Sequence, residues 1–265
     1  MAQIQHFCYL RSPKMEYPEQ SIYNRSQLLL GDEVMQAMAR ARVLIVGVGG
    51  VGSWCAEALV RSGVTQLTIV DADCICVTNI NRQVMATSRT VGQVKVDALR
   101  EHLLEINPQA QVTALRAVYN AENAADFKLD DYDYVVDAVD SLKDKIQLIL
   151  DASASKAKFF SSMGAALKVD PTRVRVAEFW EVRGCPLGAA LRKKMKQRKT
   201  LPAKKFLCVY DDEVLPNRGV NRDVETAPSS FNKAQTNGSL VHITAIFGMT
   251  ISGLIIKDIY DSIVL

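Results

Sequence analysis

The feature that most constrains the fold of this chain is the sequence Val-Leu-Ile-Val-Gly-Val-Gly-Gly-Val-Gly at residues 43–52. The four leading residues are all apolar, so we expect a buried strand over 43–46. The residues after the first glycines predict a helix over roughly 50–62. An apolar strand that runs through a glycine-rich turn into a helix is typical of a nucleotide-binding α/β domain.

The four glycines of this turn have different expected roles. Gly47 permits a tight turn, and Gly49 and Gly50 let the backbone approach a phosphate closely. Gly52 allows the helix to pack against the strand. Because the N–H groups at a helix N-terminus point toward an anion on the loop, the turn predicts a phosphate-binding site. The residues that follow the turn in the sequence indicate which nucleotide the turn binds.

Predicted strands and helices alternate along most of the chain. We expect helices over residues 27–41, 92–106 and 143–155, and strands over 66–70, 112–117, 134–139, 159–162 and 174–180. This alternation predicts an α/β fold of the Rossmann-like, doubly wound type, because strands joined by helices form a parallel sheet. We expect a mainly parallel sheet with an antiparallel C-terminal extension.

The 265 residues are predicted to form one nucleotide-binding domain over 1–265. Within it we expect a loose N-terminal arm over 1–22, a basic and flexible insertion over 183–238, and a C-terminal helix over 239–265. The first residues lack the pattern of a signal peptide, and the six cysteines lack the spacing of a disulfide framework. We therefore expect reduced thiols and a cytoplasmic location.

The last predicted helix contains a mostly apolar run over residues 240–256. This run has 17 residues, fewer than the roughly 20 that span a bilayer, and it includes His242 and Thr250. We expect a buried helix of the nucleotide domain. Membrane association through this helix remains the alternative.

Polar residues after the second strand indicate which nucleotide chemistry to expect. Asp71 follows the glycine turn by about 20 residues, where an acid accepts hydrogen bonds from ribose hydroxyls, as in NAD-binding proteins. However, Arg82 follows in Asn-Ile-Asn-Arg-Gln, and Lys95 ends Val-Gly-Gln-Val-Lys. A dehydrogenase has no evident need for these cations. A triphosphate that loses pyrophosphate does need them, because they neutralise charge on the leaving group.

Asp140 follows the strand predicted over 134–139. Ligands of open parallel sheets bind at the carboxyl ends of the strands, so we expect Asp140 to face the nucleotide. Mg²⁺ usually takes one or two carboxylates together with phosphate oxygens. Asp140 is therefore the candidate Mg²⁺ ligand.

These motifs, in this order, resemble those of the ubiquitin-activating-like adenylating enzymes, which include the ThiF and MoeB types. The resemblance rests on the glycine turn, Asp-x-Asp at 71–73, Asn-x-Asn-Arg-Gln at 79–83, Val-Gly-Gln-x-Lys at 91–95, and Asp140-Ser141. It covers roughly residues 21–165 and the last helix. Tyr-Asn-Arg at 23–25 resembles the segment whose arginine enters the partner subunit's site in this family.

The resemblance implies a role for each matching residue. It implies that ATP is bound by Gly47, Gly49, Gly50, Gly52, Asp71, Asp73, Asn79, Arg82, Gln83, Lys95, Asp140 and Ser141. It implies catalytic roles for Arg25, Arg82, Lys95 and Asp140. Asp140 would hold Mg²⁺, and Arg25 would reach across a homodimer.

The chain departs from the members of this family that activate sulfur-carrier proteins, because it lacks their two Cys-x-x-Cys pairs. Residues 164–172, the basic stretch after Cys185, and residues 208–213 resemble instead the branch of tRNA threonylcarbamoyladenosine dehydratases. That resemblance implies ATP-dependent dehydration of this tRNA modification through carboxylate adenylation and intramolecular ring closure. Two alternatives stay open: adenylation of the C-terminus of a sulfur-carrier protein, and an NAD-dependent oxidoreductase or non-catalytic nucleotide sensor.

Residues 183–205 contain nine basic residues and no acidic one. Such a cluster is a plausible contact for a phosphate backbone, so we predict that it binds tRNA. A cysteine desulfurase or other sulfur-acceptor partner is a further candidate, with Cys185 or Cys208 as the thiol that takes part. For Cys208 we favour a buried structural thiol.

Overall fold

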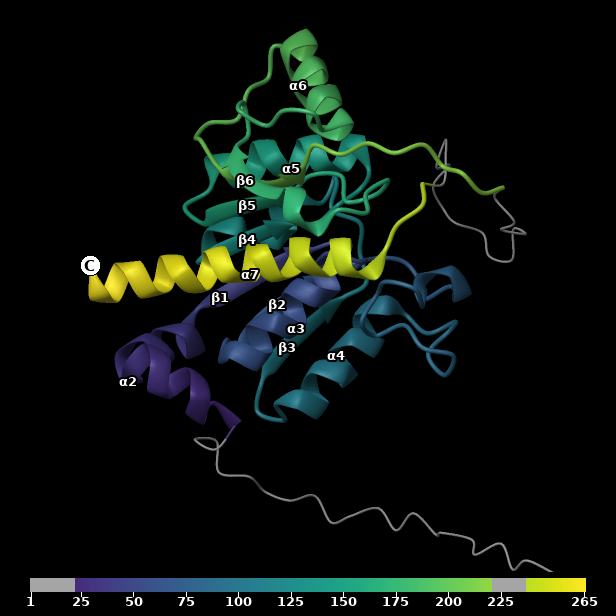
Figure 1. Ribbon diagram of the computed structural model, residues 1–265. Helices are drawn as coiled ribbons and strands as arrows, with labels where there is room; N and C mark the ends of the chain where they lie inside the picture. The colour runs from purple at the N-terminus through teal and green to yellow at the C-terminus, as the bar shows by residue number, and fades with distance from the viewer. Residues whose placement is uncertain (1–21, 221–236) are drawn as a thin grey trace, which may run out of the picture.

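The computed structural model describes residues 22–220 and 237–265. They form a seven-stranded sheet with helices on both faces (Figure 1). The arm predicted over 1–22 lies outside the described residues except for Ile22, and so does the part of the predicted insertion over 221–236.

The chain order of the elements follows the predicted alternation. The strands are β1 (Arg42–Val46), β2 (Gln66–Val70), β3 (Gln111–Leu115), β4 (Tyr134–Asp137), β5 (Lys158–Ser162), β6 (Val174–Glu178) and β7 (Leu207–Asp211). The α-helices are α2 (Asn24–Arg40), α3 (Gly52–Ser62), α4 (Lys95–Ile106), α5 (Leu142–Ala154), α6 (Pro186–Arg198) and α7 (Val241–Val264). Short 3-10 helices are η1 (Val77–Asn79), η2 (Ala124–Phe127), η3 (Leu129–Asp131) and η4 (Pro171–Arg173).

The sheet has the strand order β3-β2-β1-β4-β5-β7-β6. All neighbouring strands are parallel except β6 and β7, which are antiparallel. The predicted doubly wound, mainly parallel sheet with an antiparallel extension is therefore confirmed. The strand order reverses between β1 and β4, and the carboxyl ends of strands at such a reversal are where ligands of these folds bind.

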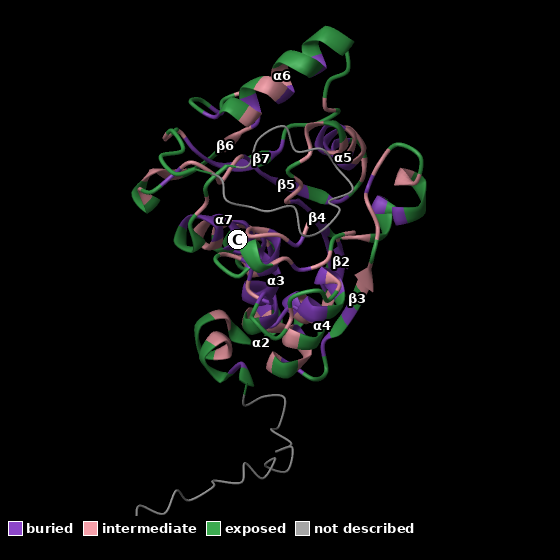
Figure 2. Ribbon diagram, turned by 90° about the vertical axis from the view of Figure 1, so that its right-hand side faces the viewer, coloured by how far each residue is buried: buried purple, intermediate pink, exposed green. Residues whose placement is uncertain are grey.

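Alternation of side chains along the central strands separates two hydrophobic cores. Val43 and Ile45 of β1 belong to the core beneath α2, α3, α4 and α7, whereas Leu44 and Val46 belong to the core beneath α5 and α6. A strand buried on both faces reads as a continuous apolar run, which explains the sequence of β1. Figure 2 shows buried residues concentrated along the sheet and on the helix faces turned toward it.

The segment predicted as a basic and flexible insertion contains two regular elements, α6 and β7. β7 lies inside the sheet between β5 and β6, and Cys208, Val209 and Tyr210 are buried there. The part of this segment that the structure describes thus contributes a strand to the main sheet. The antiparallel extension is β6, which pairs with β7.

The helix α7 crosses the sheet on the same face as α3 (Figure 1). Its buried residues Ile243, Phe247, Ile251, Ile255 and Ile259 repeat every four residues and join the core of α3 and β1. By length and hydropathy, α7 is the one helix among the described residues that could span a membrane, and 44% of its most apolar window is buried. The apolar stripe is therefore largely explained by packing inside the fold.

Candidate nucleotide site

The glycine turn begins where β1 ends and is fixed by backbone contacts. The Gly47 N–H donates to the carbonyl of Val70, at the end of β2, at 2.8 Å. Gly47 has φ +89°, and a Cβ there would lie 2.7 Å from the Ala138 carbonyl oxygen. Only glycine fits this conformation and this close approach. The turn is thus held against the segment that follows β4.

The helix α3 starts directly after the glycine turn. A Cβ at Gly52 would lie 1.9 Å from the Gly47 carbonyl oxygen, so the helix could not begin here with any other residue. Val51, the N-cap residue of α3, makes no side-chain capping hydrogen bond. The first N–H groups of an uncapped helix suit an anion, as the sequence predicts. A Cβ at Gly50 would lie 3.1 Å from Thr244, so α7 forms one wall of this turn.

Asp71 lies at the end of β2 and ties the turn to its neighbours. Its Oδ2 accepts the Val48 N–H at 3.0 Å, and its Oδ1 accepts the Asp73 N–H at 3.0 Å. A carboxylate has about four acceptor positions, so these two bonds leave room for a ribose hydroxyl. Asp71 is therefore a structural anchor of the glycine turn, a role that sequence reasoning did not foresee.

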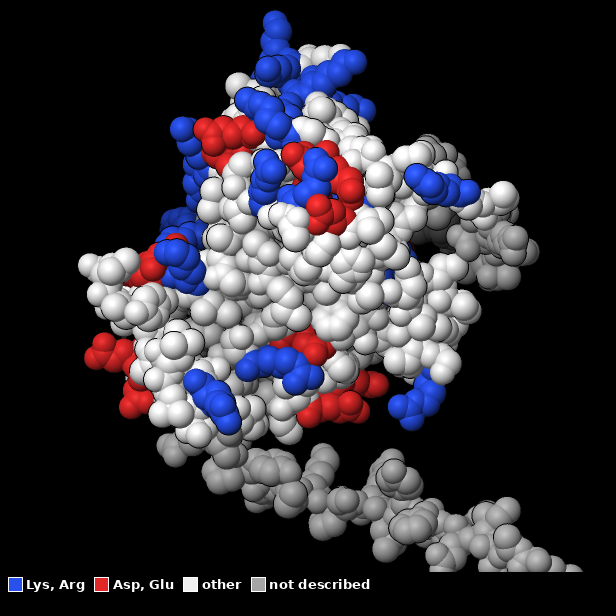
Figure 3. All heavy atoms as spheres, viewed as in Figure 1, with Lys and Arg blue, Asp and Glu red and all other residues white. Residues whose placement is uncertain are grey.

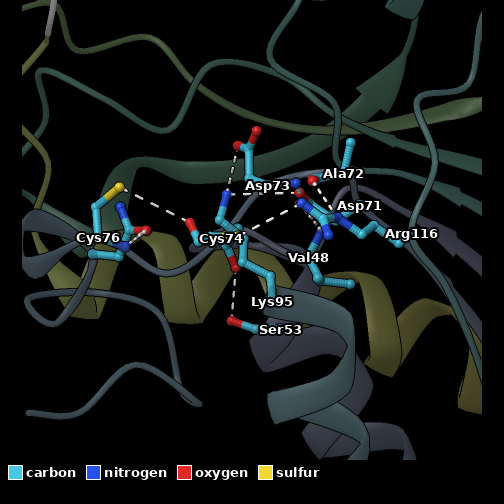
Figure 4. Close-up of polar contacts among 11 residues, drawn as sticks. Val48, Ser53, Asp71, Ala72, Asp73, Cys74, Cys76, Lys95 and Arg116 are labelled. Atoms are coloured by element: carbon cyan, nitrogen blue, oxygen red, sulfur yellow. Dashed lines mark hydrogen bonds and ion pairs between the residues drawn. The ribbon is translucent and has the colours of Figure 1, made fainter. Parts of the chain in front are cut away.

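Lys95, the first residue of α4, lies between two carboxylates (Figure 4). Its Nζ donates to Asp73 Oδ2 at 2.8 Å and is 3.7 Å from Asp71 Oδ1, while only 8% of its side chain is exposed. Burial lowers the pKa of Lys95, but the charges of Asp71, Asp73 and Asp140 outweigh burial, and the net pKa is raised. Lys95 is therefore a permanent cation at the carboxyl edge of the sheet.

The 79–83 segment lies over the first turn of α3. The Trp54 Nε1–H donates to the Arg82 carbonyl at 3.0 Å, and Arg82 Nη1 donates to the Thr78 carbonyl at 2.9 Å. Gln83 is buried, and a Cβ at Gly49 would lie 3.8 Å from its Nε2. Gln83 Oε1 is a buried oxygen without a hydrogen-bond partner among the described residues. An orphaned amide oxygen beside a glycine turn fits a ligand that supplies a donor.

Asn79 has a local structural role beside the predicted one. Its Oδ1 accepts the Cys76 N–H at 3.0 Å and caps η1, so this oxygen shapes the loop between β2 and α4. Asn81, which was not singled out, donates from Nδ2 to the Ser239 carbonyl at 2.9 Å just before α7. Both asparagines thus hold the loop in place around the glycine turn.

Asp140 and Ser141 lie between β4 and α5. Asp140 is exposed, and Ser141 occupies the N-cap position of α5. Among the residues in 22–220 and 237–265, no three His, Cys, Asp or Glu side chains form a group that could hold a metal. A single exposed carboxylate fits Mg²⁺ that takes its other ligands from phosphates and water. Asp140 would hold such an ion. It lies close enough to Lys95 for its charge to raise the pKa of Lys95.

Arg25 is not brought to the glycine turn of its own chain. It is exposed near the start of α2, next to Tyr23, whose hydroxyl donates to the Val60 carbonyl in the last turn of α3 at 2.8 Å. The glycine turn precedes the first turn of α3, so Arg25 lies at the opposite end of that helix. Any contact of Arg25 with a nucleotide would have to involve another copy of the chain.

A buried polar cluster beneath Asp140 was missed by sequence reasoning. Asp137 Oδ2 is 2.7 Å from Lys145 Nζ and accepts the Ser161 hydroxyl at 2.7 Å, and the side chains of Asp137 and Lys145 are 0% exposed. The available signal was a single aspartate at the end of an otherwise apolar strand. Nothing in the sequence marked Lys145, because lysines usually lie on the surface.

The fold and the site together define a Rossmann-like nucleotide-binding protein whose phosphate turn is flanked by a buried lysine and two aspartates. The chain belongs to the ThiF family, which its sequence matches over residues 23–262.

Three relatives place the chain more closely within this family. It is 34% identical over 244 residues to the tRNA threonylcarbamoyladenosine dehydratase of Bacillus subtilis, covering 91% of this chain and 95% of that protein. It resembles the crystal structure of the Escherichia coli dehydratase TcdA in complex with ATP, with a TM-score of 0.80, 30% identity and coverage of 92% and 95% of the two chains. The molybdopterin-synthase adenylyltransferase of Escherichia coli is 36% identical, but over only 56% of this chain and 59% of that protein.

Proposed function

We propose that this protein is an ATP-dependent tRNA threonylcarbamoyladenosine dehydratase. The observation that carries this proposal is the similarity to dehydratases along nearly the full chain, together with a structure of one of them in complex with ATP. The glycine turn and the buried Lys95 fit a triphosphate in the same place, and the orphaned Gln83 oxygen fits a hydrogen-bond donor such as a ribose hydroxyl. The similarity to the molybdopterin-synthase adenylyltransferase covers little more than half of the chain.

In the proposed reaction, the threonyl carboxylate attacks the α-phosphate of the co-substrate ATP and pyrophosphate leaves. A free carboxylate is a poor acyl donor, and adenylation converts its oxygen into a good leaving group. Lys95 and Arg82 stabilise the charge that develops on pyrophosphate, because fixed cations at a water-poor site act strongly on such charge. Mg²⁺, held by Asp140, would supply further charge neutralisation for the phosphates.

Ring closure completes the dehydration. A nitrogen or oxygen of the same modification displaces AMP, and the net loss is one water. Because the attack is intramolecular, a high effective concentration can replace a second catalytic nucleophile. Cys185 and Cys208, the two thiols considered for sulfur transfer, are buried, and burial raises the pKa of the Cys208 thiol well above its usual value.

The exposed face of α6 is the proposed contact for tRNA. Figure 3 shows Lys and Arg side chains gathered at the top of the molecule, where α6 lies in Figure 1. Two of the nine basic residues pack on aromatic rings: Arg192 lies over Phe179 and Lys196 over Trp180. The remaining exposed basic residues of α6 and its C-cap are the candidates for phosphate contacts, namely Lys193, Lys194, Arg198 and Lys199.

A homodimer is proposed because Arg25 cannot reach its own glycine turn. The same helix exposes Leu28 by 79% and Leu29 by 80%, which is unfavourable for a face that stays in water. Leu29 and Leu30 line a shallow pocket of about 300 Å³ with Gly253, Ile256 and Tyr260 of α7. A second copy that covers this face would bury the leucines and could bring Arg25 to the partner's nucleotide.

Two further parts of the proposal concern the partner protein and the location. A cysteine desulfurase or other sulfur-acceptor partner would have to exchange sulfur elsewhere than at Cys185 and Cys208, because sulfur transfer needs an accessible thiolate. An enzyme that acts on tRNA works where tRNA is, so we place it in the cytoplasm. Contact of α7 with a membrane would involve its exposed residues, such as Met249 and Ile263.

The test is incubation of the protein with ATP, Mg²⁺ and tRNA that carries threonylcarbamoyladenosine, followed by mass analysis of the nucleosides. We expect the modified nucleoside to lose the mass of one water, and Arg82→Ala to abolish that loss. Arg100→Ala, an exposed arginine on α4, is the matched control and should retain activity. Unchanged tRNA together with AMP transfer to a sulfur-carrier protein would support the rival adenylyltransferase instead.

A further inference from the structure

We propose that the buried cluster of Asp137, Lys145 and Ser161, here called the buried clamp, positions Asp140. The buried clamp thereby sets the affinity of the protein for Mg²⁺–ATP. The inference rests on the proposed function only in that Asp140 is taken as the Mg²⁺ ligand. The buried clamp has no exposed atom of its two charged side chains, so it acts through the backbone that it holds.

The buried clamp occupies both hydrogen-bonding groups of Val139, the residue directly before Asp140. The Val139 N–H donates to Asp137 Oδ1 at 3.0 Å, and Lys145 Nζ donates to the Val139 carbonyl at 3.0 Å. β4 ends at Asp137, so these groups receive no partner from a neighbouring strand. The clamp replaces the missing sheet contacts and fixes the direction in which Asp140 leaves the sheet.

The same segment supports the glycine turn. The Ala138 N–H donates to the Val46 carbonyl at 2.9 Å, and the Ala138 carbonyl packs where a Cβ at Gly47 would stand. Asp140 and the phosphate turn are therefore attached to one rigid piece of backbone. A shift of Val139 would change the distance between the Mg²⁺ ligand and the phosphates.

The stability of the fold does not explain why the buried clamp consists of charged residues. Removing two charges from water is costly, and apolar residues of similar volume often replace a buried ion pair without loss of stability. Leucine or methionine at position 145 could pack in this core but could not donate to the Val139 carbonyl. The observed pair is thus explained by the positions that it imposes on the 138–140 segment.

The experiment measures the affinity for ATP by calorimetry with and without Mg²⁺, in the wild type and in variants of Asp140 and Lys145. We expect Asp140→Asn to remove the gain in ATP affinity that Mg²⁺ produces. Lys145→Met should reduce that gain by roughly 10–100-fold, the usual effect of losing a partner outside the direct ligand shell. In the double variant the effects should not multiply, because both changes act through the same carboxylate.

Two other variants separate positioning from a general loss of folding. Asp137→Asn with Lys145→Met leaves no unpaired charge and should fold while losing the Mg²⁺-dependent gain. Lys145→Arg keeps a cation and a donor and should retain most of it. Lys158→Met breaks the Lys158–Asp258 pair at the other end of β5 and is the matched control, with a gain equal to that of the wild type.

The outcomes distinguish this inference from the proposed function. Three results would each overturn the positioning role. The Lys145→Met variant could show the same Mg²⁺-dependent gain in ATP affinity as the wild type, or the wild type could show no gain. The effects of the two substitutions could also multiply in the double variant. If Mg²⁺-dependent ATP binding follows the expected pattern but the wild type leaves the tRNA unchanged, the buried clamp stands and the dehydratase proposal fails.

Discussion

The contact of Gly248 with the start of α3 leads to a prediction with a matched control in the same helix. A Cβ at Gly248 would lie 2.5 Å from the Val51 carbonyl oxygen, 2.8 Å from the Cys55 nitrogen and 3.0 Å from Trp54 Cβ. The two closest atoms are backbone and cannot turn aside. Because Val51 directly precedes α3, Gly248→Ala pushes α7 away from the turn that is proposed to hold ATP.

The geometry sets the size of the effect. Ordinary contact begins at 3.4 Å, so α7 or α3 must move by close to an ångström. Overpacking of this kind costs about 1–3 kcal/mol in the free energy of unfolding. For a chain of this size each kcal/mol lowers the melting temperature by about 2–4 °C. Gly248→Ala should therefore lower the melting temperature by about 2–12 °C and weaken ATP binding.

Gly253 is the control because it lies in the same helix with no atom within 4 Å of its added Cβ. Alanine is a better helix former than glycine by about 0.5–1 kcal/mol. Gly253→Ala should thus raise the melting temperature and leave the contact of α7 with the start of α3 unchanged. Both variants are compared with the wild type by differential scanning calorimetry and by ATP titration. The reasoning is refuted if Gly248→Ala is neutral or stabilising.

Three other predictions follow from titration, thiol burial and surface charge. The hydrogen bond from His102 lowers the pKa of Glu57; its stabilising effect is present above the unfolded-state pKa and is lost as pH falls through the folded-state pKa. Below about pH 4.5, urea titrations should therefore show a shallower loss of stability in Glu57→Gln than in the wild type. An alkylating reagent followed by peptide mapping should label the half-exposed Cys74 in the native protein and the buried Cys208 only after unfolding; fast labelling of Cys208 would contradict its burial. Lys193→Glu should weaken tRNA binding and reduce the slope of log affinity against log salt by about one, and an unchanged slope would exclude a phosphate contact there.

Much of the fold could be predicted because its strands are short, mostly apolar runs that alternate with longer helical segments. β1, β2 and β4 are buried on both faces, and their sequences are therefore mostly apolar. β7 was missed because it follows the basic stretch, which drew the interpretation toward a flexible insertion. Its place in the sheet depends on pairing with β5, and such long-range pairing leaves no local pattern.

The candidate site was predictable where a residue's chemistry and spacing belong to a motif, and less so where its role depends on the surrounding fold. The glycine turn, Asp71 and Lys95 do come together at the carboxyl edge of the sheet. The start of α4 was expected at Gly92 but lies at Lys95, because Val94 still pairs with Cys74 across the loop. Tertiary pairing of this kind shifts an element boundary that periodicity alone cannot locate.

The contacts of the apolar helix α7 link it to the proposed nucleotide site. Its sequence allows either a membrane anchor or a core helix, and hydropathy cannot separate the two. In the structure, Thr244 faces Gly50 of the phosphate turn and Gly248 lies against the first turn of α3. A helix that left the sheet for a membrane would uncover both contacts and the buried isoleucines of α7. Because preorganised donors need no reorganisation when charge develops, the rigidity of this wall is itself part of how the turn can stabilise a phosphate. The close approach at Gly248 therefore ties the most apolar segment of the chain to nucleotide binding, whatever its exposed face contacts.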